Sequence, residues 1–186
     1  MLLAPAAVRP LRVTRSTPIG EDFAHLTYVT QWFADLDALA DYEKWEAGKN
    51  DKVAIVTEEV VLRGSDWLAW RWTHGYNKWK HVALARRAHG LSQAEFSESW
   101  RGHAGKATTK TAGTMPIPAA ARGLAYVQNH PLHGIDWPYD AITEVWFEDV
   151  LSMQVRVEWF RNNVTTDELF GEITFLTVIE EVLDLV

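Results

Sequence analysis

The 186-residue sequence contains no cysteine, which excludes disulfide bonds, thiolate metal sites and a cysteine nucleophile. It also lacks any run of about 18 apolar residues, so we expect no membrane span and no membrane partner. The N-terminal stretch MLLAPAAVRPLRV carries its arginines after a short apolar run, whereas a secretory signal places positive charge first. We therefore expect a cytoplasmic protein.

Positive charge is also scarce, since the formal net charge is −7 and the pI is near 5.5. Nucleic acid is a poor candidate partner because such a chain offers no broad basic surface to a phosphate backbone. The chain has no G-x-S-x-G elbow, no P-loop and no glycine-rich dinucleotide fingerprint, which argues against covalent serine chemistry and nucleotide cofactors. A composition of 47% hydrophobic residues nevertheless suffices for a real core in one or two small domains.

Seven histidines raise the question of a metal site. His81 and His89 straddle the end of an expected strand, and His130 and His133 flank a proline. Neither pair has the i, i+4 spacing of two zinc ligands on one helix. We therefore expect no metal and no cofactor.

Two segments of the chain resemble each other. Residues 28–35 read YVTQWFAD and precede Trp45, and residues 142–149 read ITEVWFED and precede Trp159. One shift aligns both segments, and a β-branched run containing Glu-Glu-Val follows each. Each pattern predicts strand, helix, strand, because β-branched and aromatic residues favour strands and aspartate favours helix N-caps. We interpret residues 1–64 as a partial copy of the unit that ends the chain, with chance similarity as the alternative. Because two strands alone cannot bury an apolar face, residues 27–62 should continue or face the C-terminal sheet.

Between the two copies, residues 66–80 (DWLAWRWTHGYNKWK) carry four tryptophans without clean helical or strand spacing. We expect aromatic burial to matter more there than regular structure. Residues 65–79 are therefore read as a connector, with a lid or a dimer contact as alternatives.

Residues 80–186 predict a complete domain. We expect strands at residues 81–86 and 123–130, a helix from Gln93 after the capping box of Ser92 and Glu95, and a loop at residues 108–118. The second repeat copy adds strand, helix, strand. The resulting βαββαβ order is the ferredoxin-like pattern, an α+β fold with an antiparallel sheet and both helices on one face.

Five motifs in this order resemble the EthD family, namely GLSQAEF at 90–96, WRGHA at 100–104, YVQNH at 126–130, EVWFED at 144–149 and IEEV at 179–182. The resemblance covers about residues 80–186, and residues 27–62 are similar to the second half of a further unit. It implies a homodimer that forms a dimeric α/β barrel, with activity that needs no metal or redox cofactor. The Trp-rich half-copy and the longer loop at 108–118 depart from the family pattern. Whether the barrel closes within one chain or between two chains stays open.

The helix after Ser92 places Phe96, Trp100 and His103 on one stripe that faces the sheet. An aromatic core with one satisfied histidine is the simplest interpretation of this stripe. Histidine also exchanges protons near neutral pH, which makes His103 a candidate acid or base.

On the next strand, Tyr126, Gln128 and His130 share one face, either solvated or lining a cavity for an oxygen-rich substrate. On the strand that follows, Glu144 and Trp146 share a face, and Glu144 could orient the imidazole of His130 or His103.

The leading hypothesis is a cofactor-independent lyase-type enzyme that decarboxylates or dehydrates an aromatic or polyketide-like small molecule. His103 or His130 would transfer protons, Tyr126 would hold an enolate or phenolate oxygen, and the substrate would contact a set of five side chains: Phe96, Trp100, Gln128, Glu144 and Trp146. The alternatives are a cofactor-free monooxygenase of aromatic or quinone metabolism and a non-catalytic ligand-binding barrel.

Overall fold

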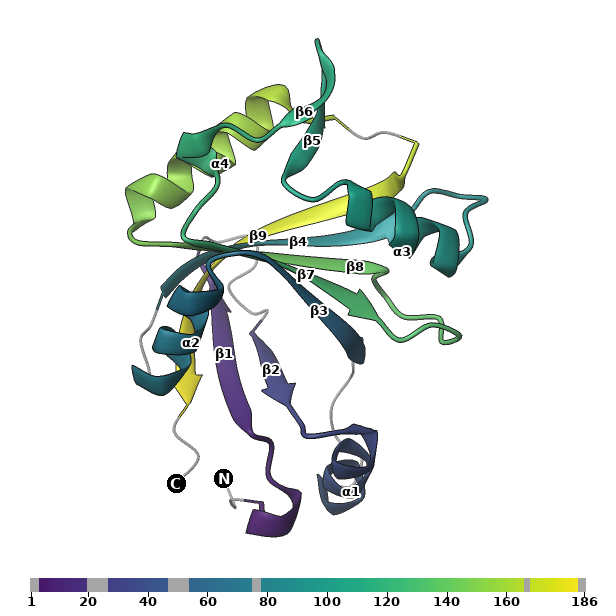
Figure 1. The fold of residues 1–186 in the computed structure, drawn as a ribbon, viewed down its shortest axis with the longest axis vertical. Helices are drawn as coiled ribbons and strands as arrows, with labels where there is room; N and C mark the ends of the chain where they lie inside the picture. The colour runs from purple at the N-terminus through teal and green to yellow at the C-terminus, as the bar shows by residue number, and fades with distance from the viewer. Residues whose placement is uncertain (1–3, 20–26, 47–53, 75–77, 166–167, 184–186) are drawn as a thin grey trace.

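The computed structural model describes residues 4–19, 27–46, 54–74, 78–165 and 168–183. This part of the chain forms an α+β fold in which a large antiparallel sheet curls around one end of the molecule (Figure 1). The strands are β1 (Arg12–Pro18), β2 (Tyr28–Trp32), β3 (Val56–Arg63), β4 (Lys78–Arg87), β5 (Lys106–Thr109), β6 (Gly113–Pro116), β7 (Ala125–Pro131), β8 (Ala141–Phe147) and β9 (Phe170–Leu183). The helices are α1 (Leu36–Glu46), α2 (Ser65–His74), α3 (Gln93–Gly102) and α4 (Val150–Asn163), with short 3-10 turns η1 (Ala6–Val8) and η2 (Ala119–Ala121).

The middle of the sheet has the strand order β9-β4-β8-β7, with every neighbouring pair antiparallel. Helix α3 connects β4 to the β5–β7 region and α4 connects β8 to β9, and both lie on the same side of the sheet, called here the helix face (Figure 1). This is the strand order that a βαββαβ pattern predicts. The helices begin where the sequence indicates: Ser92 and Glu95 form the reciprocal capping box of α3, and the Asp149 carboxylate accepts from the Ser152 N–H at 2.7 Å.

The N-terminal strands extend this sheet at both edges. Strand β1 pairs with β9, β2 pairs with β1, and β3 pairs with β7, which confirms that residues 27–62 continue the C-terminal sheet. The sheet curls until its two edge strands approach each other, and Trp32 Nε1 of β2 donates to the Glu59 carboxylate of β3 at 3.1 Å. The two similar segments hold different places, because β8 and β9 both flank β4 whereas β2 and β3 lie at opposite edges. The duplication itself stays a prediction.

Two expectations about local structure are wrong, and one strand is absent from the predicted elements. The Trp-rich segment is not irregular: residues 65–74 form α2, because Leu68 and Arg71 lie three residues apart on one buried stripe that the tryptophans alone do not reveal. The expected loop at residues 108–118 contains most of the β5–β6 hairpin, whose turn is closed by Thr109 and Gly113 at a φ of 65°. Strand β1 was not expected at all, since its buried positions Thr14 and Ser16 are polar.

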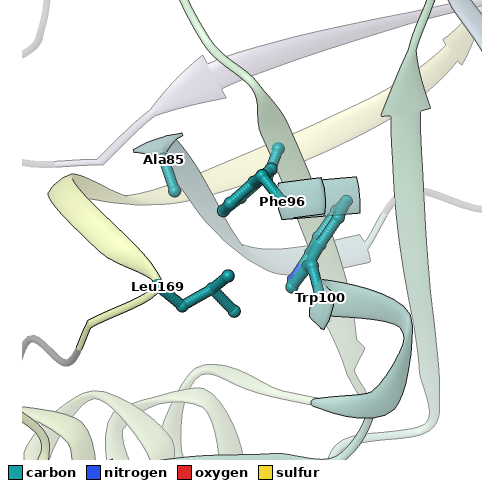
Figure 2. Close-up of a cluster of buried hydrophobic side chains, with 5 residues drawn as sticks. Ala85, Phe96, Trp100 and Leu169 are labelled. Carbon is teal, nitrogen blue, oxygen red and sulfur yellow. The ribbon is translucent and has the colours of Figure 1, made fainter. Parts of the chain in front are cut away.

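On the helix face, a compact apolar cluster joins α3 to the sheet. Phe96 and Trp100 of α3 pack with Ala85 of β4, Ala141 of β8 and Leu169 (Figure 2). The rings of Phe96 and Trp100 are stacked, with centroids 6.1 Å apart. This cluster fixes the height of α3 above the sheet and so the position of the residues at its C-terminal end.

Candidate functional site

A cavity of about 70 Å³ lies between the helix face, the two helices α3 and α4, and the hairpin. We call it the main cavity. Its aromatic walls are Trp100, Tyr126, Phe160, Phe170 and Phe175. Its polar lining includes His103, Lys106, Thr143 and Arg156. This lining combines aromatic walls with a few polar side chains, which is the chemistry that small-molecule sites use.

Arg156 is the most unusual of these residues because it is a charged residue that is only 3% exposed. Helix α4 carries it toward the sheet, where Nε donates to His81 Nδ1 at 3.1 Å and Nη1 donates to the Ala121 carbonyl at 2.8 Å. The guanidinium also lies over the ring of Phe160, 4.2 Å from the centroid. No carboxylate among the described residues forms a salt bridge with it. Burial lowers the pKa of Arg156 to about 10, so it remains a cation at neutral pH.

His81 accepts a hydrogen bond from this cation and is held neutral. Burial, with the nearby Arg156 charge, lowers the pKa of His81 to about 3. Its ring stacks on Phe175 at 5.3 Å and meets Phe160 edge-on at 5.8 Å. The imidazole therefore serves as a neutral acceptor that orients the guanidinium instead of compensating its charge.

Tyr126 and His103 complete the polar side of the main cavity. Burial raises the pKa of Tyr126, so its hydroxyl stays protonated and can donate to an oxyanion. His103 caps the C-terminal end of α3, and its ring meets Phe170 edge-on at 6.0 Å. Both residues line the cavity that Arg156 also lines, whereas the sequence left open whether Tyr126 faces solvent or a cavity.

A second and larger cavity of about 330 Å³, called here the side cavity, shares Ile117, Tyr126 and Arg156 with the main cavity. Arg63 and Arg122 line it as well. None of the described residues that line either cavity is an aspartate or a glutamate. In a chain of net charge −7, these two spaces are therefore locally cationic.

Three other predicted site residues lie on the helix face but outside the cavity lining. Phe96 is fully buried behind Trp100, and Gln128 donates to the Trp100 carbonyl at 3.0 Å. His130 contacts the Ser97 hydroxyl at 2.8 Å through Nδ1, and burial lowers its pKa. These side chains support the cavity wall and do not face the cavity, because α3 packs directly onto this part of β7.

Glu144 and Trp146 lie on the opposite side of the sheet, called here the inner face. The hypothesis that Glu144 pairs with His103 or His130 is wrong, since period-two alternation turns the carboxylate away from the helix face. Its oxygens accept instead from Lys80 Nζ at 2.6 Å and from Asn129 Nδ2 at 3.0 Å. Trp146 donates to Glu180 at 2.9 Å, so it cannot stack on a ring beside Trp100.

The inner face holds a buried ion network. Lys80 contacts both Glu144 and Glu180, and Arg71 Nη2 reaches Glu180 at 2.5 Å. Burial alone would lower the pKa of Lys80, but the two carboxylates raise it above its ordinary value. Lys80 and Arg71 lower the pKa of Glu180 against the opposing effect of burial. Two cations and two anions balance, so this network needs no external charge.

The sequence contained a usable signal for Arg156 that was missed. Met153, Val157 and Phe160 mark the apolar stripe of α4, and Arg156 lies on the same stripe, where a charge is costly unless it has a purpose. The predicted strand begins at His81 and therefore leaves out Lys80. For His81, the sequence pattern raises only the question of a metal ligand.

None of the described helices has the length and apolar character needed to cross a membrane. Within the described ranges, no three histidine, aspartate or glutamate side chains gather closely enough to hold a metal ion. Comparison with protein-family models, with curated proteins and with solved structures gives no match.

Proposed function

We propose that the protein is a cofactor-independent lyase-type enzyme of the EthD type that acts on an aromatic or polyketide-like small molecule in the main cavity. One observation carries the proposal. The buried Arg156 cation lines a cavity with aromatic walls and forms no salt bridge with a described carboxylate. A fixed and buried cation stabilises negative charge that develops on a substrate oxygen. On the inner face, by contrast, the charges of Lys80 and Arg71 are matched by those of Glu144 and Glu180.

The proton chemistry follows from the polar lining. His103 as base would remove a proton next to a carbonyl group, and the C–H bonding pair would become the double bond of an enolate. Arg156 and the Tyr126 hydroxyl would bind the enolate oxygen. In a dehydration, the enolate electrons would expel the β-hydroxyl, which would take the proton from the His103 imidazolium and leave as water. In a decarboxylation, loss of carbon dioxide from a β-keto acid would form the same enolate, and His103 would then protonate its carbon.

The inner face bears on the assembly. Two sheets of an EthD-type homodimer would pack face to face, yet this face is buried within the chain by α2, whose Leu68 packs on Ala125, Val127 and Trp146. We infer that α2 and the curled strands take the place of a second sheet. A homodimer would then use another surface.

The test uses two aryl ketones and four variants. The wild-type protein should release carbon dioxide from 3-oxo-3-phenylpropanoate or form the enone from 3-hydroxy-1-phenylbutan-1-one, without consuming dioxygen. His103→Gln, Tyr126→Phe and Arg156→Gln should each lower turnover by about 10²- to 10³-fold, the range for a lost proton donor or oxyanion contact. His130→Gln is the matched control, because His130 lies on the same sheet face outside the cavity lining. Dioxygen uptake would instead indicate a monooxygenase, and binding without turnover would indicate a ligand-binding protein.

A further inference from the structure

The side cavity has a charge pattern of its own. Arg63, Arg122 and Arg156 line it, and the structure gives none of the three a salt bridge to a described residue. Other arginines of the chain do pair with carboxylates: Arg15 with Glu181, Arg71 with Glu180, Arg87 with Asp140 and Arg101 with Glu58. Arg9, Arg12, Arg86 and Arg161 form no salt bridge with a described residue either, so what distinguishes Arg63, Arg122 and Arg156 is that all three line one space.

The backbone sets the positions of these arginines. Arg63 lies opposite Tyr126 in the β3–β7 ladder, so both side chains project from the helix face. Arg122 follows Ala121, whose carbonyl accepts from Arg156, and its own Nε donates to the Ile117 carbonyl at 2.7 Å. Tyr126 and Arg156 line both cavities, whereas Arg63 and Arg122 line the side cavity alone.

Arg63 and Arg122 are exposed and Arg156 is buried, and an anionic ligand group in this space would be attracted by all three guanidinium groups. Arginine binds carboxylates through two parallel hydrogen bonds, which also fixes the ligand's orientation. The main cavity thus supplies aromatic walls, Tyr126 and Arg156 are shared by both cavities, and the side cavity adds two further guanidinium groups.

We propose that the side cavity binds a carboxylate group of the same ligand whose ring occupies the main cavity. The ligand class is an aryl ketone with a carboxylate on a short side chain, its ketone oxygen lying between Tyr126 and Arg156. This assignment rests on the proposed function of the main cavity and specifies its substrate.

The experiment compares two stable probes of equal size, 4-oxo-4-phenylbutanoate and its neutral amide, 4-oxo-4-phenylbutanamide, by isothermal titration. The wild-type protein should bind the acid at least about tenfold more tightly than the amide, since a charge-assisted contact contributes on this scale. The double variant Arg63→Gln/Arg122→Gln should bind both probes equally, with the affinity for the amide unchanged. Arg122→Lys should retain part of the preference. Arg161→Gln removes an exposed arginine of α4 outside both cavities and should keep the full preference.

Equal affinity for the two probes in the wild-type protein would overturn the carboxylate site. A preference that survives the double variant would overturn it as well. If both probes bind equally and Arg156→Gln weakens both, the main cavity stands and only the carboxylate site is wrong. If neither probe binds, the two proposals fail together.

Discussion

Arg156 Nε donates a hydrogen bond to His81 Nδ1 across the space between α4 and β4, at 3.1 Å. Because the acceptor nitrogen must be unprotonated, this contact selects the neutral imidazole with its proton on Nε2. A buried cation thus rests on a neutral ring, which orients the guanidinium group and does not balance its charge.

The first prediction concerns stability against pH. The pKa of His81 is lowered from 6.5 to about 3 in the folded protein. Between these values the unfolded chain binds a proton that the folded protein does not, so the free energy of unfolding should fall as the pH drops below 6.5. His81 should contribute about 1.4 kcal/mol per pH unit to this loss.

Urea unfolding of the wild-type protein and His81→Asn between pH 4 and pH 7 measures this contribution. Asparagine keeps an oxygen acceptor for Arg156 Nε but does not titrate. The stability of the variant should therefore depend less steeply on pH. Parallel curves for the two proteins would contradict the neutral, buried imidazole.

The second prediction separates the contribution of the Arg156 charge from that of its directed hydrogen bonds. Arg156→Lys keeps the charge but loses the two directed hydrogen bonds to His81 and Ala121. Turnover should drop by about tenfold to a hundredfold, less than in Arg156→Gln, because the cation alone still stabilises an oxyanion. Kinetics of both variants on one substrate, with circular dichroism as a control for folding, test this order. Equal loss in the two variants would show that the charge contributes nothing.

The third prediction concerns the ion network of the inner face. Glu180→Gln removes the carboxylate shared by Lys80 and Arg71, and should lower the free energy of unfolding by about 3–5 kcal/mol because it leaves buried cations uncompensated. The neighbouring Glu181 pairs with Arg15 at the surface, so Glu181→Gln should cost less than about 1 kcal/mol. Chemical denaturation of the two variants gives both values. A small effect of Glu180→Gln would mean that the network tolerates charge imbalance.

The fourth prediction concerns the N-terminal strands. Deleting residues 1–64 would remove β1 from β9 and β3 from β7, exposing two sheet edges at once. We expect an insoluble or aggregated product, measured by its yield in the soluble fraction and by size-exclusion chromatography. A soluble, folded and active truncation would show that this half of the chain is dispensable.

The sequence alone determined the C-terminal half well. Three of its features depend only on residues that are close in sequence, and the structure retains them. They are the capping box at Ser92, the aspartate cap at Asp149 and the alternation of Tyr126, Gln128 and His130. Helix and strand periods also placed Trp100 and His103 on the stripe of α3 that faces the sheet, and Tyr126 on one face of its strand. That the three residues line one cavity is a finding of the structure.

Only the tertiary structure decided on which face of the sheet a buried charge has no salt-bridge partner among the described residues. Glu144 and Arg156 both read as isolated charges in apolar segments, yet Glu144 meets Lys80 while no described carboxylate forms a salt bridge with Arg156. Lys80 and Glu144 are far apart in the sequence and become neighbours only through the β4–β8 ladder. Whether a buried charge is balanced depends on such long-range pairings, and a linear pattern of residues does not contain them.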